Sequence, residues 1–62
     1  MCLGTIGVIT EIRDDDGVPM ALVDAGSPAL VYACLLTCPD AGVGATVLIH
    51  SGYVLEVLQE SP

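Results

Sequence analysis

Turn-forming residues divide this sequence at short intervals, and no other feature limits its fold as much. Clusters of Gly, Pro, Asp and Ser interrupt the apolar residues so often that a long helix does not fit between them. The runs between these clusters are rich in aliphatic residues, many of them β-branched, which is typical of strands. We therefore predict five strands, at residues 3–13, 18–24, 29–36, 46–50 and 53–59.

The connections between these strands are predicted to be turns and one loop. DDDG at residues 14–17 is an acidic turn in which Gly17 can take a positive φ, and Ser51–Gly52 is a tight turn. Residues 38–45 form a loop because Pro39, Gly42 and Gly44 break regular structure. The run 29–36 is continuously apolar, so periodicity does not separate strand from helix; its length and flanks favour a strand followed by a helical turn.

Five short strands with Gly-rich turns indicate an all-β fold, either a small barrel or a sandwich. Closure into a barrel removes the exposed edges that a short aliphatic sheet would otherwise present. Gly4 and Gly7 are expected to bend or bulge the first strand, and the alternation of Tyr53, Leu55 and Val57 marks two faces of the last strand. With 62 residues, the chain is expected to form a single domain, residues 1–62.

Charge and hydropathy exclude several classes of function. Eight acidic residues face one basic residue, Arg13, so neither nucleic-acid phosphates nor an anionic membrane surface would be bound. No signal peptide is visible and no apolar run approaches the ~20 residues of a membrane span, so we expect a cytoplasmic protein. The apolar fraction of 53% exceeds what so small a core can hide, which predicts an exposed apolar contact face.

The three cysteines are expected to be reduced rather than to form disulfides. Cys34 and Cys38 are predicted to be a core side chain and a loop thiol, although with Cys2 and His50 they could supply four zinc ligands on paper. Cys2 directly follows the initiator methionine, and removal of Met1 would place its thiol and the α-amino group on one carbon. Such a pair could ligate a soft metal centre.

No set of residues in the sequence is typical of a catalytic site. A Ser/His/Asp set, a phosphate-binding loop and a Gly-rich dinucleotide motif are all missing, so an enzyme is not expected. The acidic run Asp14–Asp16 lacks the spaced ligands of a calcium loop, and is interpreted as a solvated turn. A single histidine at the end of a strand, such as His50, is more often structural than a ligand.

Two stretches together resemble one family, the hydrogenase-assembly chaperones of the HypC/HupF type. The first is MCLG at the start of the chain, and the second is VGATVLIHSGYVLEVL at residues 43–58. Family members typically begin Met-Cys-aliphatic-Gly and later carry a VG-x-x-VLVH-x-G-aromatic segment. Val23–Asp24 and the Gly26 turn also lie where the family has its second and third strands, so the resemblance covers nearly the whole chain.

The resemblance implies a small five-stranded OB-like β-barrel that acts as a maturation chaperone for nickel–iron hydrogenases. By this resemblance, Cys2 carries iron as an Fe(CN)2CO group, His50 serves the same task, and Cys2, Leu3 and Gly4 contact the partners. The implied partners are a scaffold iron–sulfur maturation protein (HypD-like) and the hydrogenase large-subunit precursor. The iron is bound transiently, and no permanently bound cofactor is expected.

The sequence departs from the family pattern in two places. Thr5–Ile6 stands where the family usually has an aliphatic residue followed by Pro, and the chain stops at Pro62, where relatives often continue into a C-terminal helix. The predicted barrel is therefore a truncated form or one that lacks this helix. Two alternatives stay open: a structural barrel that self-associates, at least weakly, through its aliphatic faces with no metal role, and a zinc-stabilised domain.

Overall fold

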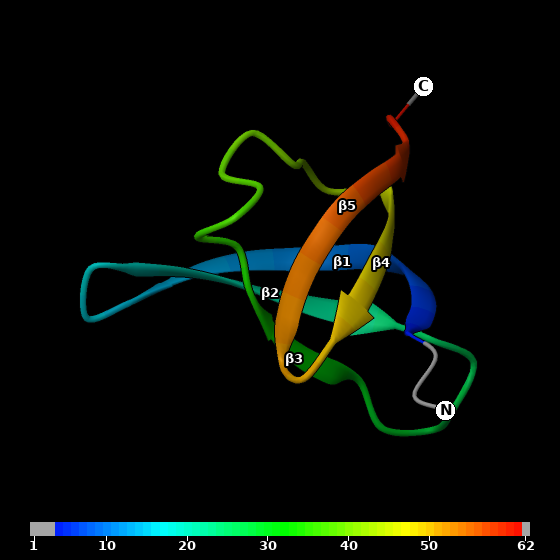
Figure 1. Cartoon of the computed structure of the whole chain (residues 1–62). Coiled ribbons are helices and arrows are strands. Elements are labelled where there is room, and N and C mark those ends of the chain that lie inside the picture. The colour runs from blue at the N-terminus through cyan, green and yellow to red at the C-terminus, as the bar shows by residue number, and fades with distance from the viewer. Residues whose placement is uncertain (1–3, 62) are drawn as a thin grey trace.

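The computed structural model describes residues 4–61, which form a closed barrel of five strands in the order β1-β2-β3-β5-β4 (Figure 1). This confirms the predicted all-β, OB-like barrel, and no helix is present in these residues. The strands predicted at residues 18–24, 46–50 and 53–59 begin and end where the sequence predicts, since the turn residues that flank them are unambiguous. The strands are β1 (Thr5–Asp15), β2 (Val18–Asp24), β3 (Val31–Cys34), β4 (Thr46–His50) and β5 (Tyr53–Gln59).

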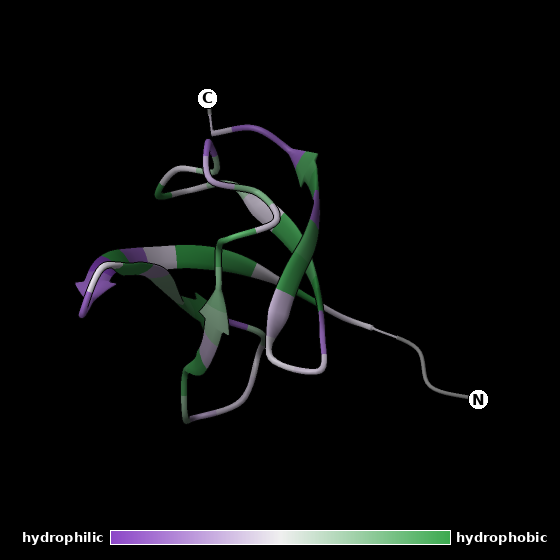
Figure 2. Cartoon of the chain, turned by 60° about the vertical axis from the view of Figure 1, so that its left-hand side comes forward, coloured by the Kyte–Doolittle hydropathy of each residue, from purple (hydrophilic) through white to green (hydrophobic). Residues whose placement is uncertain are grey.

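The hairpin between β1 and β2 is longer than the sequence predicts. Asp14 and Asp15 belong to β1, opposite Pro19 and Val18, so the predicted four-residue turn is reduced to two residues. Asp16 and Gly17 have φ values of 56° and 89°, as a two-residue turn between right-twisted strands requires. The hairpin projects from the barrel and ends in hydrophilic residues (Figure 2).

Strand β1 closes the barrel because it pairs with two strands along its length. Its first part, from Thr5 to Val8, pairs with β4, and its longer part from Val8 onward pairs with β2. Gly7 is buried and directly precedes Val8, the corner at which β1 changes its partner strand from β4 to β2. A Cβ placed on Gly7 would lie 2.6 Å from Val23 Cγ1 and 2.7 Å from the Asp24 carbonyl oxygen. The predicted bending role of Gly7 therefore has a steric cause, namely the close approach of β2.

Strand β3 is shorter than the predicted strand 29–36, because the chain turns after Cys34. The Leu35 N–H donates to the Pro19 carbonyl (2.9 Å), and the Cys38 N–H donates to the Leu35 carbonyl (3.0 Å). The second bond closes a single i→i+3 turn at residues 35–38, so the chain turns directly after the strand as predicted, but no helix forms there. β3 meets β5 in parallel at one position, Cys34 opposite Tyr53, where the Cys34 N–H donates to the Gly52 carbonyl (2.8 Å).

The core is small and almost entirely aliphatic, and Cys34 is also buried in it. Its largest fully buried side chains are Ile9, Val23, Leu35, Val47 and Val54, and none of the buried residues in the described range is polar. The loop between β3 and β4 contributes to it with buried alanines. Two backbone hydrogen bonds hold this loop to Ile9 of β1, from Ile9 N–H to the Ala45 carbonyl (3.0 Å) and from Gly44 N–H to the Ile9 carbonyl (2.8 Å).

Two irregularities in β5 overturn the simple alternation predicted for this strand. The pairing with β4 shifts twice, so Leu55 and Leu58 have no partner residue on β4. The first shift reverses the faces that follow it: Tyr53 and Leu55 are exposed, but Val57 packs against the core. The prediction that Tyr53, Leu55 and Val57 share one face is therefore wrong at Val57.

Candidate functional site

The barrel brings together two predicted site residues that are 46 positions apart in the sequence. Strands β1 and β4 pair antiparallel, and the last pair at this end is Thr5 opposite Ile49. Gly4 directly precedes Thr5, and His50 directly follows Ile49. Gly4 and His50 therefore lie at the same end of the β1–β4 pair, where the N-terminal segment joins the barrel.

Gly4 has a structural reason to be glycine at this end. A Cβ on Gly4 would lie 2.6 Å from Leu48 Cδ1 and 2.9 Å from the Ile49 carbonyl oxygen, both closer than real Cβ contacts come. The Leu48 side chain can rotate away, but the backbone oxygen of Ile49 cannot. The absence of a side chain lets the backbone at Gly4 lie close to Leu48 and Ile49 of β4. This contact within the chain is one reason for a glycine at position 4. The role of Gly4 in partner binding stays a separate prediction.

His50 is half-buried at the end of β4, immediately before the turn to β5. Ser51 and Gly52 form this turn with φ values of 54° and 80°, and His50 is opposite Tyr53 across the hairpin. The Ser51 hydroxyl lies 3.2 Å from His50 Nδ1. The sequence predicts the turn but not this contact, although a hydroxyl directly after a strand-end histidine is the local signal for it.

Cys2 and Leu3, the other residues expected at this site, lie outside the described residues. The other two cysteines are placed as the sequence predicts: Cys34 is buried, and Cys38 is half-buried in the loop. Within residues 4–61, no three His, Cys, Asp or Glu side chains gather closely enough to hold a metal ion. Cys34, Cys38 and His50 therefore do not form the ligand group that the zinc alternative requires of them.

Large aliphatic side chains are exposed on several strands, as the composition predicts. Next to the candidate site, Ile6 is 58% exposed and lies opposite Leu48, while Tyr53 beside His50 is 47% exposed. Part of the surface beside the site is thus apolar. A protein contact here would bury apolar surface, which is the main favourable term in association.

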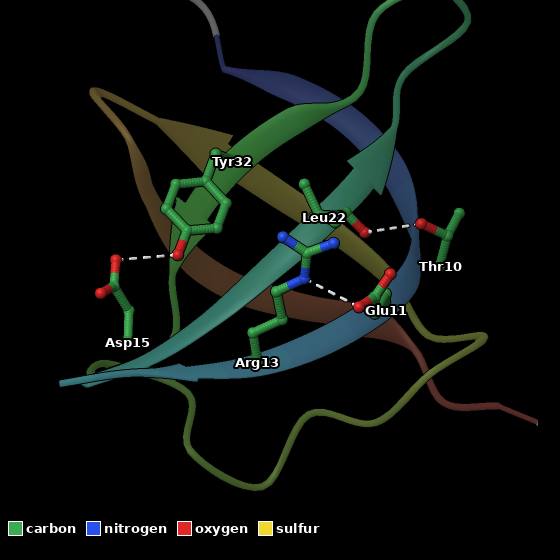
Figure 3. A network of polar contacts seen from close by, with 6 residues as sticks. All are labelled: Thr10, Glu11, Arg13, Asp15, Leu22 and Tyr32. Carbon is green, nitrogen blue, oxygen red and sulfur yellow. Dashed lines mark hydrogen bonds and ion pairs between the residues drawn. The ribbon is translucent and has the colours of Figure 1, made fainter. Parts of the chain in front are cut away.

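A second group of polar residues lies elsewhere, on the outer face of β1, β2 and β3 (Figure 3). Arg13 Nε donates to Glu11 Oε2 (2.8 Å), and this contact lowers the pKa of Glu11 and raises that of Arg13. The Tyr32 hydroxyl donates to Asp15 Oδ2 (3.0 Å), which ties β3 to the far end of the hairpin. Because both side chains of the ion pair are more than half exposed, it adds little to stability.

The Tyr32 hydroxyl should titrate at a higher pH than an ordinary tyrosine. Partial burial and then the hydrogen bond to Asp15 raise the pKa of Tyr32, because ionisation would leave two negative groups side by side. We expect Asp15→Asn to move this pKa back toward its usual value of about 10. Ultraviolet titration in a Tyr53→Phe background isolates the Tyr32 signal.

The raised pKa of Tyr32 also determines how this residue makes the stability of the fold depend on pH. A group whose pKa is raised on folding contributes its stabilisation below the unfolded pKa, about pH 10, and loses it as the pH rises through the folded value. An Asp15→Asn variant with an unchanged titration midpoint would contradict the role given to this hydrogen bond.

The fold and the site define a small β-barrel whose candidate functional residues lie at one end of the β1–β4 pair. The model of the HupF/HypC family matches residues 1–62, the whole chain, and the chain therefore belongs to the HupF/HypC family. Members of this family are hydrogenase-maturation chaperones rather than enzymes. Searches of curated protein sequences and of solved structures each return no match. The described part of the chain contains no helix long and apolar enough to cross a membrane.

Proposed function

We propose that this chaperone carries the Fe(CN)2CO group of nickel–iron hydrogenase on Cys2. It would receive the group from a scaffold iron–sulfur maturation protein in the cytoplasm and deliver it to the large-subunit precursor. The observation that carries the proposal is the position of Gly4 and His50 at one end of the β1–β4 pair. The barrel thereby unites the two stretches that resemble the family's motifs.

Chain connectivity keeps Cys2 within reach of this end of the barrel. Cys2 precedes Gly4 by two residues, so its Cα lies no more than about 7 Å from that of Gly4. A cysteine thiolate and a histidine imidazole are both good ligands for iron. With Met1 removed, the α-amino group of Cys2 would add a third donor near the same point.

Ser51 supports His50 in this proposal as a positioning residue. If the Nδ1 atom of His50 donates to the Ser51 hydroxyl, 3.2 Å away, the lone pair of the imidazole lies on Nε2. Such a hydrogen bond on the second ring nitrogen is usual for a histidine that ligates a metal. It fixes both the tautomer and the orientation of the ring.

The surface of the barrel favours transient protein partners. Apolar side chains near the site, such as Ile6 and Tyr53, are half-exposed or more. The formal net charge of −7 opposes association between copies of the chain and favours partners with basic surfaces. A carrier that must bind two proteins in turn needs contacts that form and break readily, which small, partly apolar surfaces provide.

Replacement of His50 by alanine tests the site without touching Cys2. We expect hydrogenase activity to fall about 10- to 100-fold in cells whose own chaperone of this family is deleted, because the cargo loses one donor at the barrel end. Thr46→Ala is the matched control, since Thr46 is also half-buried on β4 but lies at its other end. Equal activity of the two variants, at equal protein levels, would exclude His50 from the site.

A further inference from the structure

Strand β5 is paired along the whole of one edge but at only one position of the other. On one side it runs beside β4 from Tyr53 to Gln59, and on the other β3 meets it only at Tyr53 (Figure 1). Beyond that point β3 has ended, and the Leu35 N–H donates to the Pro19 carbonyl on the side of β2. Among the described residues, no strand covers the second edge of β5 from Leu55 to Gln59.

This edge carries neither Pro nor Lys, and it is not very short, since β5 is a seven-residue strand with the sequence YVLEVLQ. Of the features that discourage pairing at natural edges, β5 has its irregularities and one charged residue, Glu56. An open strand of this composition is a template for an added strand.

The two irregularities of β5 give this edge an apolar character. Seven residues of β5 stand against five of β4, and the two surplus residues are both leucines, Leu55 and Leu58. They are 46% and 45% exposed. The first irregularity reverses the alternation after Leu55, so that Leu58 lies on the exposed side of the strand together with Leu55.

We propose that the β5 edge, residues Leu55–Gln59, binds an extended segment of a partner protein in which apolar side chains alternate with Lys or Arg. The segment would add a strand to the barrel through main-chain hydrogen bonds, and Leu55 and Leu58 would contact its apolar side chains. This binding surface is separate from the end of the barrel that holds Gly4 and His50. It does not depend on the iron-carrying role.

Charge decides which occupant fits this edge. Glu56 lies between the two leucines and Glu60 directly follows the strand, while the one basic side chain of the chain, Arg13, lies on β1 against Glu11. A basic segment would therefore meet opposite charge at Glu56 and Glu60. A second copy of this chain would instead place its own Glu56 and Glu60 against these residues, which like-charge repulsion opposes.

Nuclear magnetic resonance with defined peptides tests this proposal on the full chain. The probe is a heptapeptide of alternating lysine and valine; the first control has proline in place of each valine, and the second has glutamate in place of each lysine. The proline peptide keeps the charge but gives up half of its backbone donors. We expect only the lysine–valine peptide to shift the amide signals of Leu55–Gln59 and to protect them from exchange.

A pair of charge-matched variants locates the contact. Leu55→Lys and Leu30→Lys each replace a leucine that is 46% exposed and add one positive charge, so both change the net charge of the protein by the same amount. Leu55→Lys should weaken peptide binding about 10-fold, and Leu30→Lys by about 2-fold at most. Equal loss in both variants, equal binding of the proline peptide, shifts centred on another strand, or self-association of the free chain through β5 would each overturn the proposal.

Discussion

Replacement of Cys2 by alanine should abolish hydrogenase maturation. We expect hydrogenase activity to fall at least about 100-fold in cells that depend on this chaperone, because the change removes the thiolate that is proposed to bind the iron group. Cys2 lies outside the five strands that form the barrel, the first of which begins at Thr5. The variant should therefore keep the unfolding midpoint of the wild-type protein, which circular dichroism measures.

The matched control for this experiment is Cys38→Ala. Cys38 is a free, half-buried thiol in the loop between β3 and β4, and the proposed function gives it no role. We expect this variant to support maturation at the wild-type level. If Cys2→Ala keeps full activity and still recovers the scaffold protein in pull-down, the Cys2 thiol is not required. The barrel would then have a purely structural or adaptor role.

Replacement of Gly7 by alanine should cause the largest loss of stability among single changes that add only a methyl group. The added Cβ would meet Val23 Cγ1 at 2.6 Å and the Asp24 carbonyl oxygen at 2.7 Å. Because a backbone oxygen in a paired strand cannot move freely, β1 and β2 must separate at the corner where β1 changes partners. Overpacking of this kind costs about 1–3 kcal/mol.

A chain of this length has little stability to lose. About 0.05–0.15 kcal/mol per residue is typical, and each kcal/mol lowers the midpoint of so small a domain by about 4–8 °C. We therefore expect Gly7→Ala to lower the thermal midpoint by about 4–24 °C. Gly42→Ala is the control, since its Cβ would have no atom within 4 Å and its midpoint should change little. Similar midpoints for the two variants would contradict the packing described at the β1 corner.

The turn residues explain why the strand pattern could be predicted from the sequence. Asp16–Gly17 and Ser51–Gly52 both adopt positive φ at two successive positions, a conformation that few residue pairs tolerate. They determine where β2 and β5 begin. Short-range chemistry of this kind is visible in the sequence before any long-range contact is known.

Two of the errors in the strand predictions have long-range causes, whereas the longer β1–β2 hairpin follows from its two-residue turn. β3 ends where its register with β2 brings Leu35 opposite Pro19, which has no N–H to donate in return. The faces of β5 reverse because its pairing with β4 is irregular. Neither that register nor that irregularity is encoded in the local pattern. The alternation of Tyr53, Leu55 and Val57 is regular in the sequence, and the barrel overrides it.

The candidate site was predictable only in part, for a similar reason. The motif resemblance names Cys2, Gly4 and His50, but nothing local indicates that positions 4 and 50 lie at one end of a strand pair. That follows from the β1–β4 register, which the closure of the barrel determines. The contact between Ser51 and His50 depends on the φ of 54° at Ser51, which becomes visible only in the folded turn.

The central claim is that Cys2 carries the iron group, and infrared spectroscopy tests it most directly. The chain is purified together with the scaffold protein from hydrogenase-producing cells, then separated from it, and the spectrum is recorded where metal-bound CO and cyanide stretch. The account predicts bands of both ligands on the separated wild-type chain, and neither on the Cys2→Ala variant. Bands of equal strength on the variant, or a wild-type chain without them, would contradict it.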